Sequence, residues 1–107
     1  MLFWRLRWQP VDLDARHRVL LLLLERKRFV EAEVEGKTLV GQSPNDAEAH
    51  NLLGVAIASQ SEARLAEAAR HFGEALRLDP SYRDAQNNLA QANLVLQPPP
   101  GREGPER

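Results

Sequence analysis

Apolar residues recur along most of this chain at the spacing of one face of a helix. The stretch 47–59 shows this i, i+3, i+4 pattern most clearly. Its apolar positions are Ala49, Leu52, Leu53, Ala56 and Ile57. Further helices are expected over residues 13–28, 29–41, 62–78 and 83–96. No stretch alternates as a half-buried strand does, so the pattern predicts an all-α protein of five helices.

Turn-forming residues separate these helices. Residues 42–46 read Gln-Ser-Pro-Asn-Asp, in which Asn45 or Asp46 is suited to cap the following helix. Asp79 and Pro80 end the fourth helix because proline cannot continue it. Ser81 is expected to cap the fifth helix, which must end before Pro98.

Small and large residues in the third and fourth helices stand where two antiparallel helices must touch. Gly54 lets a second backbone approach closely, and Phe72 fills the space between the helices. The motif residues are Leu53-Gly54, Ala68, Phe72, Ala75 and Pro80. This layout resembles a tetratricopeptide repeat, a helix–turn–helix unit of about 34 residues. The resemblance implies an α-solenoid of antiparallel helix pairs with about two and a half repeats.

The resemblance divides the chain into five parts. They are an aromatic and basic segment at 1–12, repeats at 13–46 and 47–82, a capping helix at 83–97 that is the first helix of a partial third repeat, and a disordered Pro/Gly-rich tail at 98–107. The first repeat departs from the family pattern, since Leu20 replaces a small residue and Gly36 replaces a large one. The turn at 59–62 is two residues longer than usual. We expect the fifth helix to cap the stack with Gln86, Asn93 and Gln97.

Composition narrows the class of protein without naming a function. A chain of 107 residues with 43% apolar content suits one small domain with one core. A formal net charge of −1 does not indicate a nucleic-acid partner. Cysteine is absent, which removes disulfides and thiolate metal sites and fits a reducing compartment. We therefore expect a cytoplasmic protein.

The chain carries no recognisable arrangement for catalysis. His17, His50 and His71 lie too far apart in the sequence for a zinc motif, and no glycine-rich loop follows a strand. His50 is expected to be structural and His71 to face outward. Glu31, Glu33 and Glu35 are expected to form a solvated helix face. The sequence thus predicts no enzyme, no metal and no cofactor.

The family resemblance implies where a partner would bind. Proteins of this kind hold a peptide or a partner helix in a concave groove lined by the first helix of each repeat. The corresponding residues here are His17, Leu21, Leu24, Asn51, Val55, Asn87, Asn88 and Gln91. The acidic residues Asp14, Glu48 and Asp84 stand nearby and would repel a dicarboxylate. A ligand of mixed apolar and basic character is favoured instead.

The first ten residues are unusual in composition. Trp4 and Trp8 flank Arg5 and Arg7, with no acidic residue among them. The segment is interpreted either as a flap over the open end of the first repeat or as a membrane-surface anchor, because Trp and Arg favour lipid headgroups. It is too short in apolar residues for a signal peptide. The apolar run at 19–24 is likewise far shorter than a membrane span.

The sequence therefore predicts a non-catalytic scaffold or adaptor for protein–protein interaction. One alternative is structural self-assembly, as a homodimer formed through the open ends of the solenoid. A second alternative is a peripheral membrane adaptor that uses Trp4 and Trp8. A nucleic-acid partner is not expected.

Overall fold

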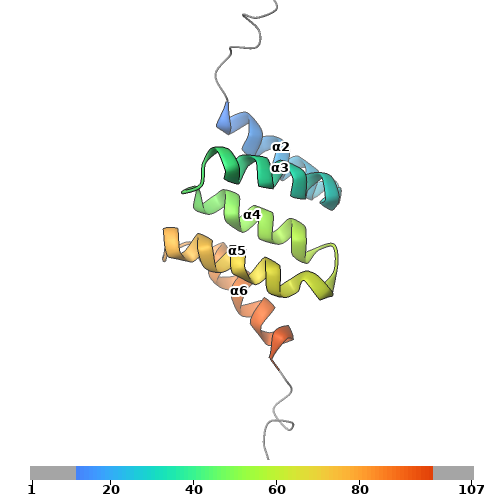
Figure 1. Ribbon diagram of the computed structural model, residues 1–107, viewed down its shortest axis with the longest axis vertical. Helices are drawn as coiled ribbons and strands as arrows, with labels where there is room; N and C mark the ends of the chain where they lie inside the picture. Colours follow the sequence, from blue (N-terminus) through green and yellow to red (C-terminus); the bar gives the residue numbers. More distant parts are fainter. Residues whose placement is uncertain (1–11, 98–107) are drawn as a thin grey trace, which may run out of the picture.

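The computed structural model describes residues 12–97, and these fold entirely into helices and short turns (Figure 1). The elements are α2 (Leu13–Glu25), α3 (Phe29–Gln42), α4 (Ala47–Ala58), the short 3-10 helix η1 (Glu62–Arg64), α5 (Leu65–Leu78) and α6 (Arg83–Leu96). The predicted all-α class with five α-helices is confirmed for this part of the chain. The predicted aromatic segment with Trp4 and Trp8, and the predicted tail at 98–107, lie outside the described residues.

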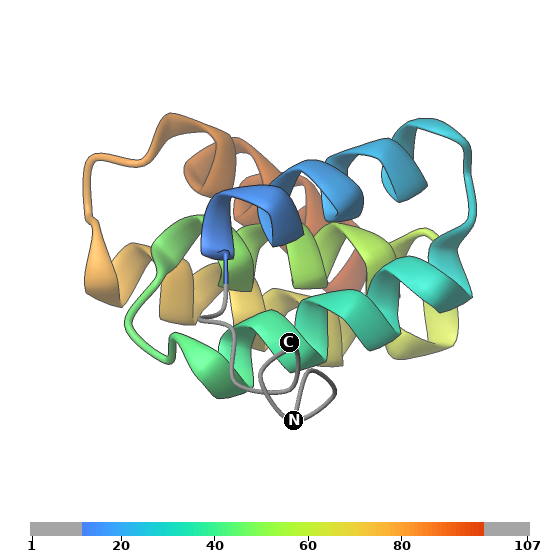
Figure 2. The same ribbon diagram turned by 90° about the horizontal axis from the view of Figure 1, so that it is seen from above.

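Each helix packs against the helix that follows it, and consecutive helices run in opposite directions (Figure 1). The most extensive contact joins α4 to α5. Contacts also join α2 to α4 and α4 to α6, so that these three helices lie on one side of the stack (Figure 2). Helices α3 and α5 form the other side. The result is a compact five-helix arrangement in which α4 is the central element.

Two apolar clusters, both including residues of α4, form the core. The first cluster comprises Leu20, Ala32, Leu39, Ala49, Leu52 and Ala56. The second comprises Leu53, Ile57, Ala68, Phe72 and Ala92. Adjacent residues of α4, such as Leu52 and Leu53, enter different clusters because they point about 100° apart on a helix. Helix α4 therefore joins the helices before it to the helices after it.

The contact between α4 and α5 depends on the absence of a side chain at Gly54. A Cβ placed there would lie 2.5 Å from Cε1 of Phe72 and 3.1 Å from the carbonyl oxygen of Ala68. Ala68 and Phe72 are themselves buried. Glycine thus lets α5 approach closely while the Phe72 ring fills the space beside it, as the sequence predicted.

Side chains cap the helix starts that the sequence marked, with one exception. Asp46 caps α4, because its Oδ1 accepts a hydrogen bond 3.1 Å long from the backbone N–H of Ala49. The predicted capping role of Ser81 is wrong. Its hydroxyl and its backbone N–H both donate to Oδ1 of Asp79, and α6 begins only after Tyr82. Asp79 thus stabilises the turn, and the Ser81 side chain does not cap α6 because its hydroxyl is bonded to Asp79.

Helix α2 ends three residues earlier than expected, at Glu25. Lys27 adopts a φ of 61°, in the left-handed region that usually favours glycine. The N–H of Lys27 donates to the carbonyl of Leu24, and the N–H of Arg28 donates to that of Leu23. This pair of hydrogen bonds closes the helix as a Schellman motif, so the basic run at 26–28 forms a turn.

Glu33 corrects the expectation of a solvated acidic face on α3. It is only 8% exposed, and its two carboxylate oxygens accept hydrogen bonds of 2.8 and 2.7 Å from the guanidinium of Arg64. Gln60, in the lengthened turn, donates a further bond of 2.7 Å. Hydrogen bonding to Arg64 outweighs burial, with help from Gln60 and Lys37, and holds the pKa of Glu33 well below its usual range. The longer turn thus ties α3 to the start of α5.

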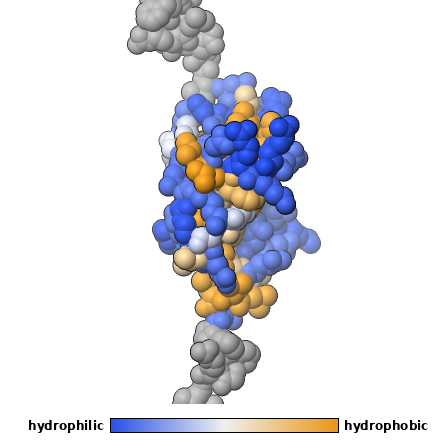
Figure 3. Space-filling model, turned by 90° about the vertical axis from the view of Figure 1, so that its right-hand side faces the viewer, coloured by the Kyte–Doolittle hydropathy of each residue, from blue (hydrophilic) through white to orange (hydrophobic). Residues whose placement is uncertain are grey.

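The two ends of the stack expose both polar and apolar side chains. Gln86, Asn93 and Gln97 are exposed, as expected for a capping helix. Large exposed apolar residues also occur at both ends: Val19 and Leu22 on α2, and Leu94, Val95 and Leu96 on α6. Figure 3 shows apolar surface gathered at its lower end, the end of the stack that α6 forms. No helix within residues 12–97 is long and apolar enough to cross a membrane.

Candidate functional site

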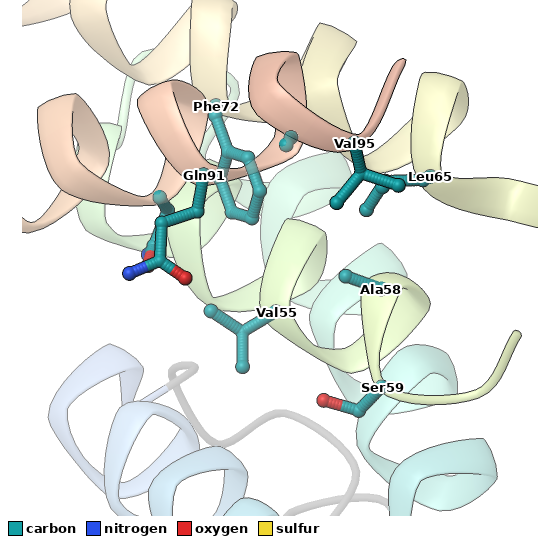
Figure 4. A pocket seen from close by; sticks show the side chains of 9 residues that line it. Val55, Ala58, Ser59, Leu65, Phe72, Gln91 and Val95 are labelled. Atoms are coloured by element: carbon teal, nitrogen blue, oxygen red, sulfur yellow. The ribbon is translucent and has the colours of Figure 1, made fainter. Parts of the chain in front are cut away.

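A pocket of about 280 Å³ lies between α4, α5 and α6. Its lining residues are Val55, Ala58 and Ser59 of α4 and its C-cap, Leu65 and Phe72 of α5, and Asn88, Gln91, Ala92 and Val95 of α6. Figure 4 shows Val55 and Ala58 facing Gln91 and Val95 across the space. The α6 residues of the lining recur three or four positions apart, so they share one face of that helix.

The pocket combines apolar walls with a few polar groups. Leu65, Phe72 and Val95 supply apolar surface, while Ser59, Asn88 and Gln91 supply hydroxyl and amide groups. None of the lining side chains carries a formal charge. Apolar walls with a few placed hydrogen-bonding groups are typical of sites that bind an apolar group in a defined orientation.

Acidic side chains line two hollows where α2, α4 and α6 begin. One hollow, where α4 and α6 begin, is lined by Ala47, Glu48, Asp79, Tyr82 and Asp84. The other, where α2 and α4 begin, is lined by Asp14, His17, Arg18 and Glu48. Glu48 belongs to both, so the hollows adjoin. Together these four carboxylates, from Asp14, Glu48, Asp79 and Asp84, form what we call the acidic end. Arg18 and a protonated His17 offset part of their charge, and the remaining negative charge favours cations over anions.

His17 links α2 to the start of α4. Its Nδ1 donates to the carbonyl of Leu13 at 2.7 Å, and its Nε2 lies 2.8 Å from Oδ2 of Asp46 and 3.7 Å from Oε1 of Glu48. Because Nδ1 must carry a proton to donate to the Leu13 carbonyl, Nε2 can donate to a carboxylate only when the ring holds a second proton and is charged. Burial opposes this charge, but the Leu13 carbonyl, Asp46 and Glu48 together outweigh it and raise the pKa of His17.

Asn51 and Asn88 form a polar contact between α4 and α6. Asn88 Nδ2 donates to Asn51 Oδ1 at 2.9 Å, and Asn51 Nδ2 lies 3.5 Å from the hydroxyl of Tyr82. Asn51 is only 3% exposed. Burial, followed by the nearby carboxylate of Glu48, raises the pKa of Tyr82. This network holds α6 against α4 between the pocket and the acidic end.

The residues predicted to line a groove have different surroundings in the structure. Val55, Asn88 and Gln91 come together in the pocket. Leu21 and Asn87 are exposed, whereas Leu24 packs against the first core cluster and His17 is partly buried beside Asp46. Asn51 and Asn87 share a phase in the sequence, but only Asn51 is buried. Helix α4 has neighbours on both sides, whereas α6 ends the row. A binding role for these residues stays a prediction.

Sequence reasoning did not assign Leu65, Phe72 and Val95 to the site. The first two belong to α5, which the resemblance places behind the groove, yet they form the floor of the pocket. Phe72 was recognised only as a packing residue. The spacing of Asn88, Gln91, Ala92 and Val95 along one helix face was the signal that could have revealed the α6 wall.

The other histidines lie on α4 and α5, away from the pocket. His50 is buried and its Nε2 donates to the carbonyl of Pro44 at 3.0 Å, consistent with a structural role. Its ring stacks on that of His71, with centroids 5.9 Å apart, so the prediction that His71 faces outward is wrong and the residue is partly buried. Burial, then the neighbouring His50 and Arg70, lowers the pKa of His71. Among residues 12–97, no three side chains of the metal-binding types are grouped to hold an ion.

No model of a protein family matches the chain, and a search of curated proteins gives no match either.

Proposed function

We propose that this protein is a non-catalytic interaction module of tetratricopeptide type, which binds a peptide or helix of a partner protein. The serial antiparallel packing of α2 to α6 supports this class, as does the close contact of Gly54 with Phe72. The absence of cysteine is compatible with a role in the cytoplasm.

The observation that carries the proposal is the pocket and its position relative to the acidic end. The pocket takes an apolar side chain, and the acidic end attracts a basic one. Partner segments that combine both kinds of residue therefore suit this surface. A segment ending in two carboxylates does not, because Asp14, Glu48 and Asp84 would repel it.

Binding of labelled peptides to the full chain, measured by fluorescence anisotropy, tests the proposal. The panel contains peptides that pair Leu, Phe or Trp with Arg or Lys, and matched peptides in which Glu replaces the basic residue. Val55→Glu should weaken binding of the best peptide about tenfold, because it places a charge in the pocket. Val34→Glu is the control, since Val34 is 62% exposed on α3 and outside the pocket.

A charge reversal tests the acidic end separately. Glu48→Lys combined with Asp84→Lys should slow association of the basic peptides and remove its salt dependence. Glu31→Lys is the matched control on an exposed part of α3. The proposal is wrong if no peptide of the panel binds, or if Val55→Glu and Val34→Glu have the same effect.

A second function, structural self-assembly, is favoured by the exposed apolar residues at the ends of the stack. Leu94 is 76% exposed and Val95 53%, and Val19 and Leu22 are also exposed at the other end. Assembly through these ends would give a mass that rises with concentration in light scattering behind a sizing column. Leu94→Glu should then restore the monomer, and a monomer at all concentrations in the unmodified chain would exclude this function.

A further inference from the structure

The pocket matches one large side chain better than a small-molecule ligand. Its volume of about 280 Å³ lies just below the ~300–1,000 Å³ typical of small-molecule sites. Phe72 and Leu65 line it from α5 and Val95 from α6, which suits a flat aromatic ring. Ser59 and Gln91 at its lining offer partners for a ring N–H. An aromatic side chain with a polar ring group, such as tryptophan, therefore suits the pocket.

The acidic end lies at a defined distance from this pocket. Glu48 and Val55 both belong to α4 and are seven residues apart, which is two helical turns or about 10 Å. A ligand that fills the pocket and pairs with Glu48 must therefore present a basic group about 10 Å from its aromatic group. In a polyproline II chain, three residues span about 9 Å, and side chains three residues apart lie on one face.

Residues 1–11 of this chain have that chemistry and that spacing. Trp4 and Arg7 are three residues apart, and no acidic residue occurs in the segment. The segment leads directly into α2, whose first residues lie at the same end of the stack as the first residues of α4 and α6 (Figure 2). Going back along the chain from α2, Arg7 comes before Trp4. This order of Arg7 and Trp4 matches the order of the two sites, because the acidic end lies nearer the start of α2 than the pocket does.

The length of the segment is sufficient for this path. Trp4 lies eight positions before Asp12, the N-cap of α2, and an extended chain reaches about 27 Å over eight positions. Crossing from α2 towards the far side of α4 and along two turns requires roughly 15–20 Å, given helix spacings of 8–10 Å. Residues 5–11 are therefore long enough for Trp4 to reach the pocket.

We propose that residues 1–11 are an intramolecular ligand of the surface formed by the pocket and the acidic end. Trp4 occupies the pocket, and Arg7 pairs with the acidic end. This inference rests on the proposed function, since it assigns the binding surface a first occupant within the chain itself. A partner peptide then has to displace the segment, so its apparent affinity is its intrinsic affinity multiplied by the fraction of molecules in which the site is free.

Tryptophan fluorescence tests the proposal directly, because both tryptophans of the chain lie in this segment. Trp8→Phe leaves Trp4 as the single emitter in the full chain. Its emission should be blue-shifted and protected from acrylamide. Adding Val55→Glu should shift the emission to the red and raise the quenching constant, whereas adding Val34→Glu should change neither. Equal emission in all three variants would overturn the proposal.

Disulfide trapping gives a second, independent measurement, because the chain contains no cysteine of its own. Phe3→Cys combined with Ser59→Cys, next to the pocket, should close a disulfide within one chain. Phe3→Cys combined with Thr38→Cys is the control, since Thr38 is exposed on α3 and outside the pocket. Equal yields in both variants, or a disulfide mainly between two chains, would contradict occupation within the same molecule.

Partner binding separates the failure of this inference from the failure of the proposed function. Trp4→Ala should raise the apparent affinity for the best peptide of the panel, because it removes the competing segment. If Val55→Glu weakens peptide binding while Trp4 emission is insensitive to it, the groove binds partners and the segment is not its ligand. If Val55→Glu changes neither readout, both proposals are wrong.

Discussion

The first helix pair, α2 with α3, and the second pair, α4 with α5, use large and small residues in opposite ways. In the second pair the first helix carries Gly54 and the second carries Phe72, and the two residues touch. In the first pair Leu20 stands at the position of Gly54, and Gly36 at that of Phe72. Leu20 is fully buried, so the large residue fills the core from the other helix.

The two glycines also face different helices. A Cβ at Gly36 would meet Leu53 of α4, with its Cδ1 at 3.1 Å, and no atom of α2 is as near. Gly36 therefore brings α3 against the second pair, whereas Gly54 closes the second pair on itself. The polar links Glu33–Arg64 and His17–Asp46 also run from the first pair to the second. The first pair is thus joined to the second by close packing at Gly36 and by two polar links.

Among the changes that test this comparison, removing the Phe72 ring should lower the free energy of unfolding most. Phe72→Ala is expected to lower the free energy of unfolding by about 4 kcal/mol, since it empties a buried aromatic site. Leu20→Ala, the large residue of the first pair, should cost about 3 kcal/mol. Urea titrations followed by circular dichroism measure both. A smaller loss of stability for Phe72→Ala than for Leu20→Ala would show that the large residue of the first pair contributes more than that of the second.

Removing the Glu33 carboxylate, which links α3 to the start of α5, should lower the free energy of unfolding by about 2 kcal/mol. This is the scale of a hydrogen bond to a charged group. Glu33→Ala makes this change, and Glu31→Ala, on an exposed part of the same helix, should cost less than about 0.5 kcal/mol. Because the pKa of Glu33 is lowered on folding, its contribution is present above its ordinary pKa of 4.5 and is lost as the pH falls below it. Unfolding of wild type and Glu33→Ala should therefore converge in acid; a constant difference would refute the link.

Replacing Gly54 or Gly36 with alanine should change the free energy of unfolding by different amounts in the two helix pairs. Gly54→Ala is expected to lose about 1–2 kcal/mol, because the Phe72 ring must move and the gain in helix propensity only partly compensates. Gly36→Ala should stay within about 0.5 kcal/mol of wild type, because the gain in helix propensity offsets the small shift needed at Leu53, whose Cδ1, Cβ and Cα would lie 3.1–3.3 Å from the new Cβ. Gly41→Ala and Gly73→Ala are controls with no atom within 4 Å of the new Cβ. Both should gain about 0.5–1 kcal/mol in the same urea titrations. Equal results at Gly54 and Gly36 would remove the contrast.

The smallest expected effect concerns His17, the link from α2 to α4. Its pKa is raised on folding from the ordinary 6.5, so its contribution is complete below that pH and is lost as the pH rises through the folded value. His17→Gln should remove this dependence while costing about 1 kcal/mol or less at pH 6. Urea midpoints between pH 6 and pH 9 measure the slope. A wild-type protein whose stability is flat over this range would show that the histidine gains no proton on folding.

The sequence predicted the helices well because their signals are local. Periodic apolar residues, Asp46 as a cap and Pro80 as a stop all act within one or two turns of the chain. Two of its errors arose where a partner comes from far along the chain or from a competing near neighbour. Glu33 is buried by Arg64, 31 residues away, and Ser81 is engaged by Asp79. Neither choice of partner is visible in a hydrophobic pattern.

For the candidate site, helix phase identified Val55, Asn88 and Gln91, but burial was decided elsewhere. Asn51 has the same phase as Asn87, yet it is enclosed because α4 has a neighbour on each side. Leu65 and Phe72 enter the pocket from α5 only because Gly54 lets that helix come close.

The sequence by itself determined which residues form helices, where these helices begin and end to within a few residues, and which faces are apolar. Tertiary structure alone decided which glycine faces which helix, that Glu33 is buried in an ion pair, and that α4, α5 and α6 enclose a pocket. The physical reason is range. Helix formation and capping depend on neighbours in the chain, whereas burial and ion pairing depend on what the packed helices bring together.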